Sequence, residues 1–300
     1  MYYDVNNTNF PYDISKEYSK YNIPVGASVP NKYKSNLDDN INLFSYQKFI
    51  EEYMNKNSPY RGLLLYYGLG SGKTLTSINV AEQSGKEVVV LLPKSLRVNF
   101  IEELIKYVPK YQRPKDYSSL DEKEKRRIDK TLVNTISKKY SFISSNASTS
   151  SQKIFELSDG TSGSSSKLSD EALDQFTRQI NSLDNKFLII DEVHNLLNNM
   201  INPDTKNGTI IYDLIMSAKN LRILFLSGSP IVNDPFEIAL LYNMLRGYMY
   251  EKNSKKKYTV FPDYREFNEL FVDYDTNSMK NIQLFKERIV GLTSFYGGVK

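Results

Sequence analysis

Residues 62–83 read "GLLLYYGLGSGKTLTSINVAEQ", and the class of fold follows from this stretch. The apolar run at 63–67 predicts a buried strand, three glycines come next, and a helical pattern follows Lys73. A strand, a glycine-rich turn and a helix in this order point backbone N–H groups and the positive helix end at one anion. The alternative interpretation is a glycine-rich turn with an exposed lysine. Because all the parts occur in the required order, we predict a phosphate-binding loop.

The loop departs from the usual G-x-x-x-x-G-K-[ST] spacing only at its first position, where Tyr67 stands and Gly68 is the nearest glycine. That position contributes mainly to entry into the turn, so the phosphate contacts do not depend on it. Lys73 can reach the β- and γ-phosphates, and the Thr74 hydroxyl can bind Mg²⁺. We therefore predict that ATP and Mg²⁺ bind here, with nucleotide contacts from Gly68, Gly70, Ser71, Gly72, Lys73 and Thr74.

Composition limits the class of protein. The chain has 300 residues, of which 40% are hydrophobic, and no cysteine, so it can bury a large core without disulfides. No N-terminal apolar stretch resembles a signal peptide, and no apolar run reaches about 18 residues, so we expect a soluble, cytoplasmic protein without membrane contact. The net charge of +4 neither requires nor excludes a nucleic-acid partner.

Apolar runs recur along the chain and alternate with helical patterns. Four more runs follow the loop, at 87–93, 139–145, 186–192 and 222–228. Continuous apolar runs are typical of parallel strands that are covered on both faces. Helical patterns lie between or beside them, at 44–54, 75–85, 97–108, 121–130 and 170–183. This alternation predicts an α/β fold with a doubly wound, mostly parallel sheet flanked by helices.

The domain organisation follows from the segments that lack this alternation. Residues 1–42 show no sustained period, so we expect an extended N-terminal arm, and 43–300 are expected to form the nucleotide-binding lobe. The Ser- and Gly-rich segment 144–170 cannot bury a core and is expected to be a mobile insertion. Residues 234–300 are expected to form a helical C-terminal part of the lobe.

The C-terminal part is expected to open with a capped helix. Asp234 can be the N-cap, Pro235 stands at the first helical position, and Glu237 completes a capping box.

A second constellation stands in "NKFLIIDEVHNLL", residues 185–197. An apolar strand delivers Asp191 to its end, where a carboxylate can hold Mg²⁺, and Glu192 can orient and deprotonate the attacking water. His194 follows two residues later and is the only histidine in the chain. A lone histidine is more often structural than functional. With the loop, the pattern predicts Lys73, Asp191 and Glu192 as the catalytic residues.

The pair "GSGKT" and "DEVH", more than a hundred residues apart, resembles the ATP-binding, RecA-like lobe of superfamily 2 DExH-box helicases. The resemblance implies that Gln47 in "FSYQKFIEEYM" reads adenine. It implies that three polar residues couple the ATP site to a nucleic-acid site: His194, Ser227 and Ser229. It also implies contacts to the nucleic-acid backbone from Pro93, Lys94, Ser95, Ser144 and Ser145.

Within this superfamily the chain is most similar to helicase-like nucleoside triphosphatases of large cytoplasmic DNA viruses, of the poxviral nucleoside triphosphatase I and early transcription factor small subunit type. Their "YHGLGTGKT", "DEVHN" and "SYYRG" are similar to "YYGLGSGKT", "DEVHN" and "SFYGG" here. The resemblance covers roughly residues 43–298. It implies an ATPase that moves on or remodels DNA or RNA in viral transcription, beside the transcription machinery, in the cytoplasm or packaged in a virion.

Three departures from the family bear on activity. Ser227-Gly228-Ser229 replaces S-A-T, "SFYGG" lacks the arginine of the closing motif, and no arginine-finger motif occurs up to Lys300. The resemblance therefore implies that full activity needs a second RecA-like lobe, in a longer chain or in trans. Two alternatives stay open: a nucleotide-binding scaffold without net hydrolysis, and a P-loop ATPase that acts on protein or small molecules.

Overall fold

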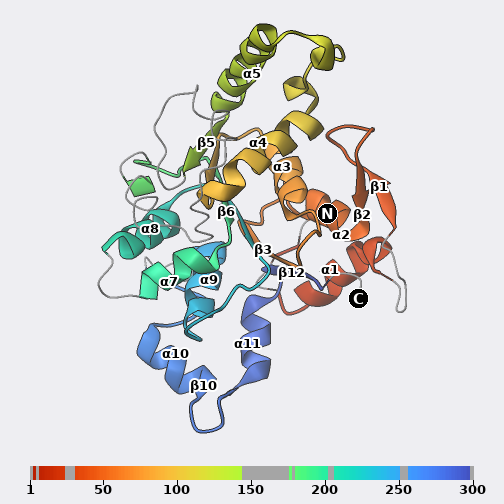
Figure 1. Ribbon diagram of the computed structural model, residues 1–300. Helices are drawn as coiled ribbons and strands as arrows, with labels where there is room; N and C mark the ends of the chain where they lie inside the picture. Colours follow the sequence, from red (N-terminus) through yellow and green to blue (C-terminus); the bar gives the residue numbers. More distant parts are fainter. Residues whose placement is uncertain are drawn as a thin grey trace.

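A six-stranded sheet forms the centre of the computed structural model, which describes residues 3–4, 7–23, 31–143, 176–177, 180–201, 206–250 and 256–297 (Figure 1). All neighbouring strands in this sheet are parallel. Their spatial order is β12 (Thr293–Tyr296), β3 (Gly62–Tyr67), β7 (Arg222–Ser227), β6 (Phe187–Asp191), β4 (Val88–Leu91) and β5 (Tyr140–Ile143). The five strands predicted from apolar runs and the α/β fold with a parallel sheet are confirmed.

Helices cover both faces of the sheet, which is why its central strands are apolar along their length. One face packs against α1 (Phe10–Glu17), α2 (Ser45–Tyr53), α3 (Lys73–Gln83), α4 (Lys94–Tyr107) and α5 (Glu122–Ser137). The other packs against α7 (His194–Ile201), α8 (Lys206–Ser217), α9 (Glu237–Arg246), α10 (Tyr264–Phe271) and α11 (Ile282–Ile289). Leu63 and Leu65 of β3 belong to the first core and Leu64 to the second, so the arrangement is a doubly wound, RecA-like lobe.

Short elements decorate this lobe. Three two-stranded antiparallel sheets pair β1 (Lys32–Lys34) with β2 (Asn42–Phe44), β8 (Met249–Tyr250) with β9 (Lys257–Tyr258), and β10 (Val272–Asp273) with β11 (Ser278–Met279). Single 3₁₀ turns are η1 (Ser19–Tyr21), η2 (Pro109–Tyr111) and η3 (Tyr117–Ser119). In Figure 1, α5 projects at the top of the molecule, and α10 and α11 form its lower end.

The N-terminal segment folds onto the lobe, so the expectation of an extended arm is wrong for its described residues. In α1, Phe10 is 1% exposed, and the centre of its ring lies 5.9 Å from the centre of the Tyr60 ring in an edge-on contact. Further along, β1 pairs with β2 and so lies beside the start of α2. An eight-residue helix and three-residue strands are too short to show a hydrophobic period, which explains the error.

The helix α9 starts at Glu237, three residues after Asp234, so the predicted capping box is wrong. The Asp234 carboxylate accepts a hydrogen bond from the N–H of Phe236 at 2.7 Å and closes a turn ahead of the helix. The Glu237 carboxylate accepts instead from the N–H groups of Val232 at 2.8 Å and Asn233 at 3.2 Å. The loop before the turn therefore supplies the donors that the capping box was expected to supply.

The C-terminal part holds strands as well as helices, and one of these strands joins the main sheet. β12, the segment that contains "SFY" of "SFYGG", pairs with β3 at the edge of the main sheet. The Ser-rich insertion 144–170 and most of the helix expected at 170–183 lie outside the described residues. No helix in the described part of the chain combines the length and the apolar character that crossing a membrane requires.

Candidate nucleotide-binding site

The glycine-rich loop joins β3 to α3 at the carboxyl edge of the sheet, where ligands of open α/β sheets bind. Gly70 and Gly72 have φ angles of 72° and 76°, in the left-handed region that other residues avoid. Gly72 is also the N-cap of α3. A Cβ atom on Gly72 would lie 2.5 Å from Nε2 of Gln47, so both its backbone angle and its surroundings require glycine.

Lys73 folds back over the loop. Its Nζ donates to the carbonyl of Tyr67 at 3.0 Å and to that of Gly68 at 3.3 Å. The Ser71 hydroxyl also donates to the Gly68 carbonyl, at 2.6 Å. The half-buried Thr74 follows in the first turn of α3. The predicted phosphate-contacting residues are therefore one continuous structure, with the Lys73 ammonium held within the loop.

Gln47 lies against this loop. The residue is 3% exposed, its Oε1 accepts from the N–H of Phe44 at 2.9 Å, and its Nε2 lies 3.3 Å from the Gly72 carbonyl. Sequence reasoning missed its neighbour Tyr46, whose hydroxyl donates to the Ser71 carbonyl at 2.7 Å. Tyr46 appeared in the sequence only as one apolar position of a helical pattern. Two consecutive side chains of α2 thus brace the phosphate loop.

Asp191 ends β6 beside the loop and is 6% exposed. Burial, and next the charge of Glu192, raise the pKa of Asp191 to about 6, while the Lys73 ammonium acts in the opposite direction. A carboxylate that has lost most of its water and faces a lysine of a phosphate loop suits a divalent cation. Mg²⁺ is commonly held by one or two protein ligands together with substrate phosphates and water. Asp191 and Thr74 fit that donor set.

Glu192 adopts a left-handed backbone conformation with φ 53°, which is uncommon for a residue with a side chain. Its N–H donates to Oδ1 of Asp191 at 3.0 Å. Its own carboxylate lies 3.3 Å from Nδ1 of His194. Backbone strain of this kind persists where surrounding contacts hold it and is frequent at functional sites. The turn places Asp191 and Glu192 in different surroundings although they are adjacent in sequence.

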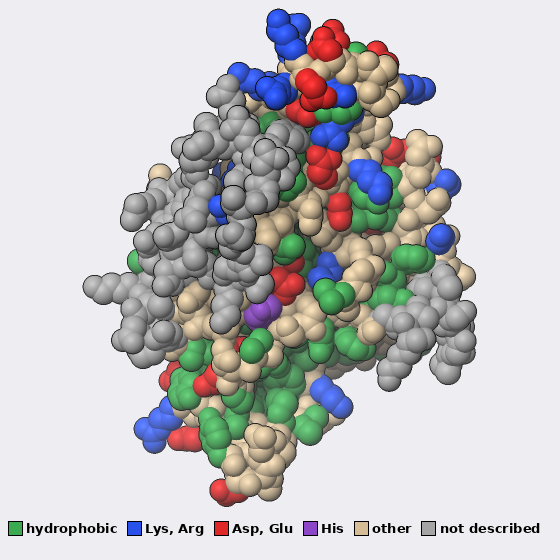
Figure 2. Space-filling model, in the orientation of Figure 1, with side chains coloured by type: hydrophobic (Ala, Val, Ile, Leu, Met, Phe, Trp, Pro, Cys, Tyr) green, Lys and Arg blue, Asp and Glu red, His purple; other side chains and the backbone are tan. Residues whose placement is uncertain are grey.

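The His194 side chain contacts residues at the ends of two neighbouring strands, Glu192 after β6 and Ser227 in β7. Its Nδ1 lies 3.3 Å from Oγ of Ser227 at the end of β7, and this hydroxyl accepts from the N–H of Ser229 at 3.0 Å. Ser227 is fully buried. Figure 2 shows the single histidine side chain at the surface, beside acidic side chains, near the centre of the molecule. The structure therefore brings together the three residues to which sequence analysis gave a coupling role.

The loop after β7 is fixed by Glu237, a residue that sequence reasoning had treated as a helix cap. Glu237 is fully buried and holds the N–H groups of Val232 and Asn233. The Asn233 amide donates to Oδ1 of Asn198 in α7 at 2.6 Å. This loop therefore connects the end of β7 to the helix that starts with His194. A glutamate at the start of a helix offered no separate signal for this role.

The residues expected to contact nucleic acid are only partly described. Pro93 caps α4 at the carboxyl end of β4, and Lys94 and Ser95 lie in the first turn with half-buried and exposed side chains. They share the edge of the sheet with the phosphate loop, because parallel strands end at the same edge. Ser144 and Ser145 lie outside the described residues.

The chain is similar to several viral proteins. A mimivirus protein (Acanthamoeba polyphaga mimivirus) named as a candidate ATP-dependent RNA helicase is 31% identical over 99% of this chain and 48% of its own length. A termination factor NPH-I homologue of African swine fever virus is 32% identical over 79% of this chain and 28% of its own length. The chain thus spans less than half the length of these curated relatives.

A crystal structure of the Pyrococcus furiosus Hef helicase domain aligns with 76% of this chain and 40% of that chain, with a TM-score of 0.37 and 17% identity. The fold of this chain is established by its own strand order and parallel pairing. A model of the family described as type III restriction enzyme, res subunit, matches residues 31–231, which include the phosphate loop, "DEVH" and the end of β7. The chain belongs to this helicase family.

Proposed function

We propose that this chain is the ATP-binding lobe of a DExH-type, nucleic-acid-dependent ATPase that moves on or remodels DNA or RNA. One observation carries the proposal: Nδ1 of His194 lies 3.3 Å from both the Glu192 carboxylate and the Ser227 hydroxyl. A lobe that only binds nucleotide has no chemical need for a general base joined in this way to the neighbouring strand.

In the proposed reaction, water attacks the γ-phosphate of ATP and the bond to ADP breaks. Glu192 accepts a proton from that water, and Lys73 with the N–H groups of the loop holds the phosphates. Thr74 and Asp191 would hold Mg²⁺, which would neutralise the negative charge of the phosphates. We assign the reading of adenine to Gln47, because its amide already lies against the loop.

Coupling to nucleic acid is proposed to run through the ends of the neighbouring strands. Lys94 and Ser95 at the start of α4 would donate their N–H groups to phosphates of the backbone, because a helix start favours anions. Pro93, which has no N–H, would contact the backbone only through its ring as the N-cap of this helix. Ser144 and Ser145 are proposed to do the same after β5. The loop that follows Ser227 and Ser229 would then pass changes at the nucleic acid to His194, since these residues are hydrogen-bonded in series.

The whole protein is proposed to act in viral transcription together with the transcription machinery, in the cytoplasm or in a virion. The name of the African swine fever virus relative, a termination factor homologue, supports this proposal. A second RecA-like lobe, in a longer chain or in trans, is proposed to supply the arginine that stabilises the transition state. Such an arginine is worth about 10³–10⁵ in rate where it is present.

The test is ATP hydrolysis by this chain and by the complete open reading frame that encodes it, each with and without single-stranded and duplex DNA and RNA. We expect slow turnover by the chain and brisk, nucleic-acid-stimulated turnover by the complete product. Binding to nucleic acid should weaken steeply as the salt concentration rises. ATP binding without turnover in either protein would favour the scaffold alternative, and turnover that ignores nucleic acid would favour an ATPase acting on other substrates.

A further inference from the structure

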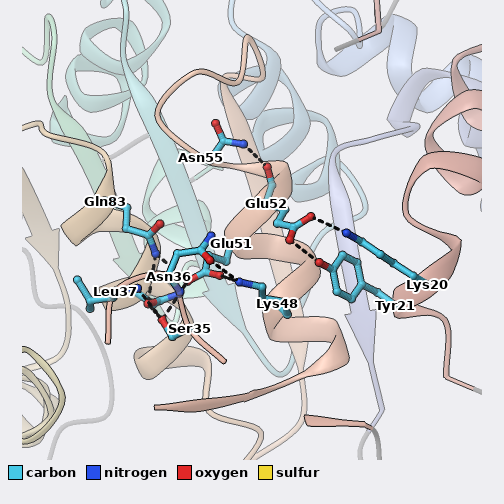
Figure 3. A network of polar contacts seen from close by, with 11 residues as sticks. Lys20, Tyr21, Ser35, Asn36, Leu37, Lys48, Glu51, Glu52, Asn55 and Gln83 are labelled. Carbon is cyan, nitrogen blue, oxygen red and sulfur yellow. Dashed lines mark hydrogen bonds and ion pairs between the residues drawn. The ribbon is translucent and has the colours of Figure 1, made fainter. Parts of the chain in front are cut away.

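A buried carboxylate lies outside the residues discussed so far. The side chain of Glu51 in α2 is 0% exposed, and Figure 3 shows it at the centre of a polar network. Its Oε2 is paired with the Lys48 ammonium. Its Oε1 accepts hydrogen bonds from four donors: Ser35 Oγ at 3.0 Å, Asn36 N at 2.8 Å, Asn79 Nδ2 at 2.7 Å and Gln83 Nε2 at 2.8 Å.

These donors come from three separate segments. Ser35 and Asn36 follow β1 in the N-terminal segment, Lys48 belongs to α2, and Asn79 and Gln83 belong to α3. The contacts also link the donors to one another. The Ser35 hydroxyl lies 2.7 Å from Oδ1 of Asn79 and shares its single proton between this oxygen and Glu51, and Lys48 Nζ donates to Oδ1 of Asn36 at 2.8 Å. The network therefore ties the N-terminal segment and α2 to the helix that carries the phosphate-loop lysine.

The position of Glu51 in α2 relates this network to the phosphate loop. Glu51 stands one helical turn after Gln47, so both side chains leave the same side of α2. Gln47 contacts the carbonyl of Gly72 at the start of α3, whereas Glu51 contacts Asn79 and Gln83 further along the same helix. Polar contacts at the start of α3 and further along it thus limit how far α2 can slide or turn relative to α3.

The charge of Glu51 makes these contacts sensitive to small shifts of the helices. Burial by itself would raise the pKa of Glu51, but the hydrogen bonds from Lys48, Asn79, the N–H of Asn36 and Gln83 together lower it. The carboxylate is therefore held in its charged form, and a buried charge is costly wherever it loses its donors. Apolar packing would tolerate a small shift of α2, whereas this network does not, because each donor meets the carboxylate in one geometry.

We propose that Glu51 is a positioning residue for the nucleotide site, and that the segment 31–41 is part of the support of that site. This inference rests on the proposed ATP-binding function. Glu51 touches no nucleotide in this scheme. It holds α2 so that Gln47 and Tyr46 meet the phosphate loop, and the N-terminal segment contributes Ser35 and the N–H of Asn36 to the same carboxylate.

The chain offers a matched control. Glu82 lies on α3, its side chain is 3% exposed, and it is paired with Lys110 at 2.7 Å and Lys139 at 3.3 Å. It also accepts from the Tyr140 hydroxyl at 2.8 Å. Its partners come from η2, from the turn between α5 and β5, and from β5, so Glu82 braces α3 against these elements, and none of its described contacts is with α2. Replacing Glu82 by Gln removes a buried charge of the same kind without touching the alignment of α2.

The experiment measures the Kd for Mg²⁺–ATP by calorimetry on the parent chain, on the variants Glu51→Gln, Asn79→Ala and Glu82→Gln, and on the double variant of Glu51→Gln with Asn79→Ala. The temperature is one at which thermal unfolding shows all five proteins to be folded. We expect Glu51→Gln and Asn79→Ala each to weaken ATP binding about ten-fold, because small misplacements of positioning groups have effects of this size or more. Their double variant should bind ATP only slightly more weakly than either single variant, because both substitutions disrupt the same hydrogen bond between Glu51 and Asn79. Glu82→Gln should change the Kd less than about two-fold, even if it lowers the thermal midpoint as much as Glu51→Gln does.

Two results would overturn the inference. Unchanged ATP affinity in folded Glu51→Gln and Asn79→Ala would show that the network only adds stability. An equal loss of affinity in Glu82→Gln would show that any loosening of α3 has the same effect. Failure of the parent chain to bind ATP would instead refute the proposed function, so the two failures can be told apart.

Discussion

Nδ1 of His194 lies 3.3 Å from Oε2 of Glu192, so the only histidine in the chain contacts the carboxylate that we propose as general base. The same nitrogen lies 3.3 Å from the Ser227 hydroxyl on the neighbouring strand. A movement of the end of β7 therefore changes the surroundings of the base through one imidazole.

Replacing His194 by Ala should leave the Kd for ATP within about two-fold of the parent, because His194 lies beyond the residues that would hold the phosphates. Stimulation of hydrolysis by nucleic acid should fall by about ten-fold or more, since the path from Ser227 to Glu192 is cut. Calorimetry measures the first quantity and a phosphate-release assay of the complete product with saturating nucleic acid the second. Intact stimulation would remove His194 from the coupling path.

The variant Glu192→Gln should keep binding of Mg²⁺–ATP and lower hydrolysis by about 10²–10⁴, the usual weight of a positioned general base. Glutamine has nearly the same shape and keeps the left-handed backbone, so the thermal midpoint should change little. Turnover and ATP affinity are measured on the same preparation. If Mg²⁺–ATP binding is lost, Glu192 holds the metal and its role must be exchanged with that of Asp191.

In the variant Lys73→Ala, nucleotide binding or hydrolysis should be abolished while the fold is kept. The ammonium makes its described hydrogen bonds to two loop carbonyls, those of Tyr67 and Gly68, so its removal should cost only about 1 kcal/mol of unfolding free energy. Calorimetry with ATP and urea unfolding give the two numbers. A folded Lys73→Ala protein that binds ATP as well as the parent would disprove the phosphate-loop assignment.

Gly72 and Gly85 form a matched pair for testing the packing of α2 on the loop. Their φ angles are 76° and 70°, but an added Cβ would lie 2.5 Å from Gln47 Nε2 at Gly72 and would meet nothing within 4 Å at Gly85. We expect Gly85→Ala to lower the unfolding free energy by about 1–2 kcal/mol, through backbone strain alone. Gly72→Ala should cost more and should also weaken ATP binding. Equal costs would mean that Gln47 moves aside freely.

Stability should depend on pH through Glu51. Because its folded pKa is lowered, the carboxylate stabilises the protein above its unfolded pKa, near 4.3, and this contribution is lost as pH falls through the folded value. Glu51→Gln should therefore be about 2–3 kcal/mol less stable than the parent at pH 7, with a difference that shrinks below about pH 4. Urea unfolding at pH 7, 5 and 3.5 checks this. A difference that stays constant with pH would mean that charge is not what the network requires.

Short-range patterns in the sequence were sufficient for five of the six strands of the sheet and for the residues of the proposed chemistry. Five continuous apolar runs became β3, β4, β5, β6 and β7, because burial on both faces of a parallel sheet leaves a signal at every strand position. The glycines of the loop and the Asp191-Glu192 pair were also readable, since backbone freedom and a carboxylate at a strand end are local properties.

Only the tertiary structure decided what surrounds that site. The pairing of β12 with β3 sets Phe295 opposite Tyr66, and the fold of the N-terminal segment places Ser35 on Glu51 and Phe10 on Tyr60. Such contacts join short elements that are far apart in the chain, so no local period of hydrophobic residues predicts them. The raised pKa of Asp191 has the same origin. Burial by the rest of the protein removes the water that would keep the pKa of this carboxyl in its usual range, and the local motif does not predict that burial.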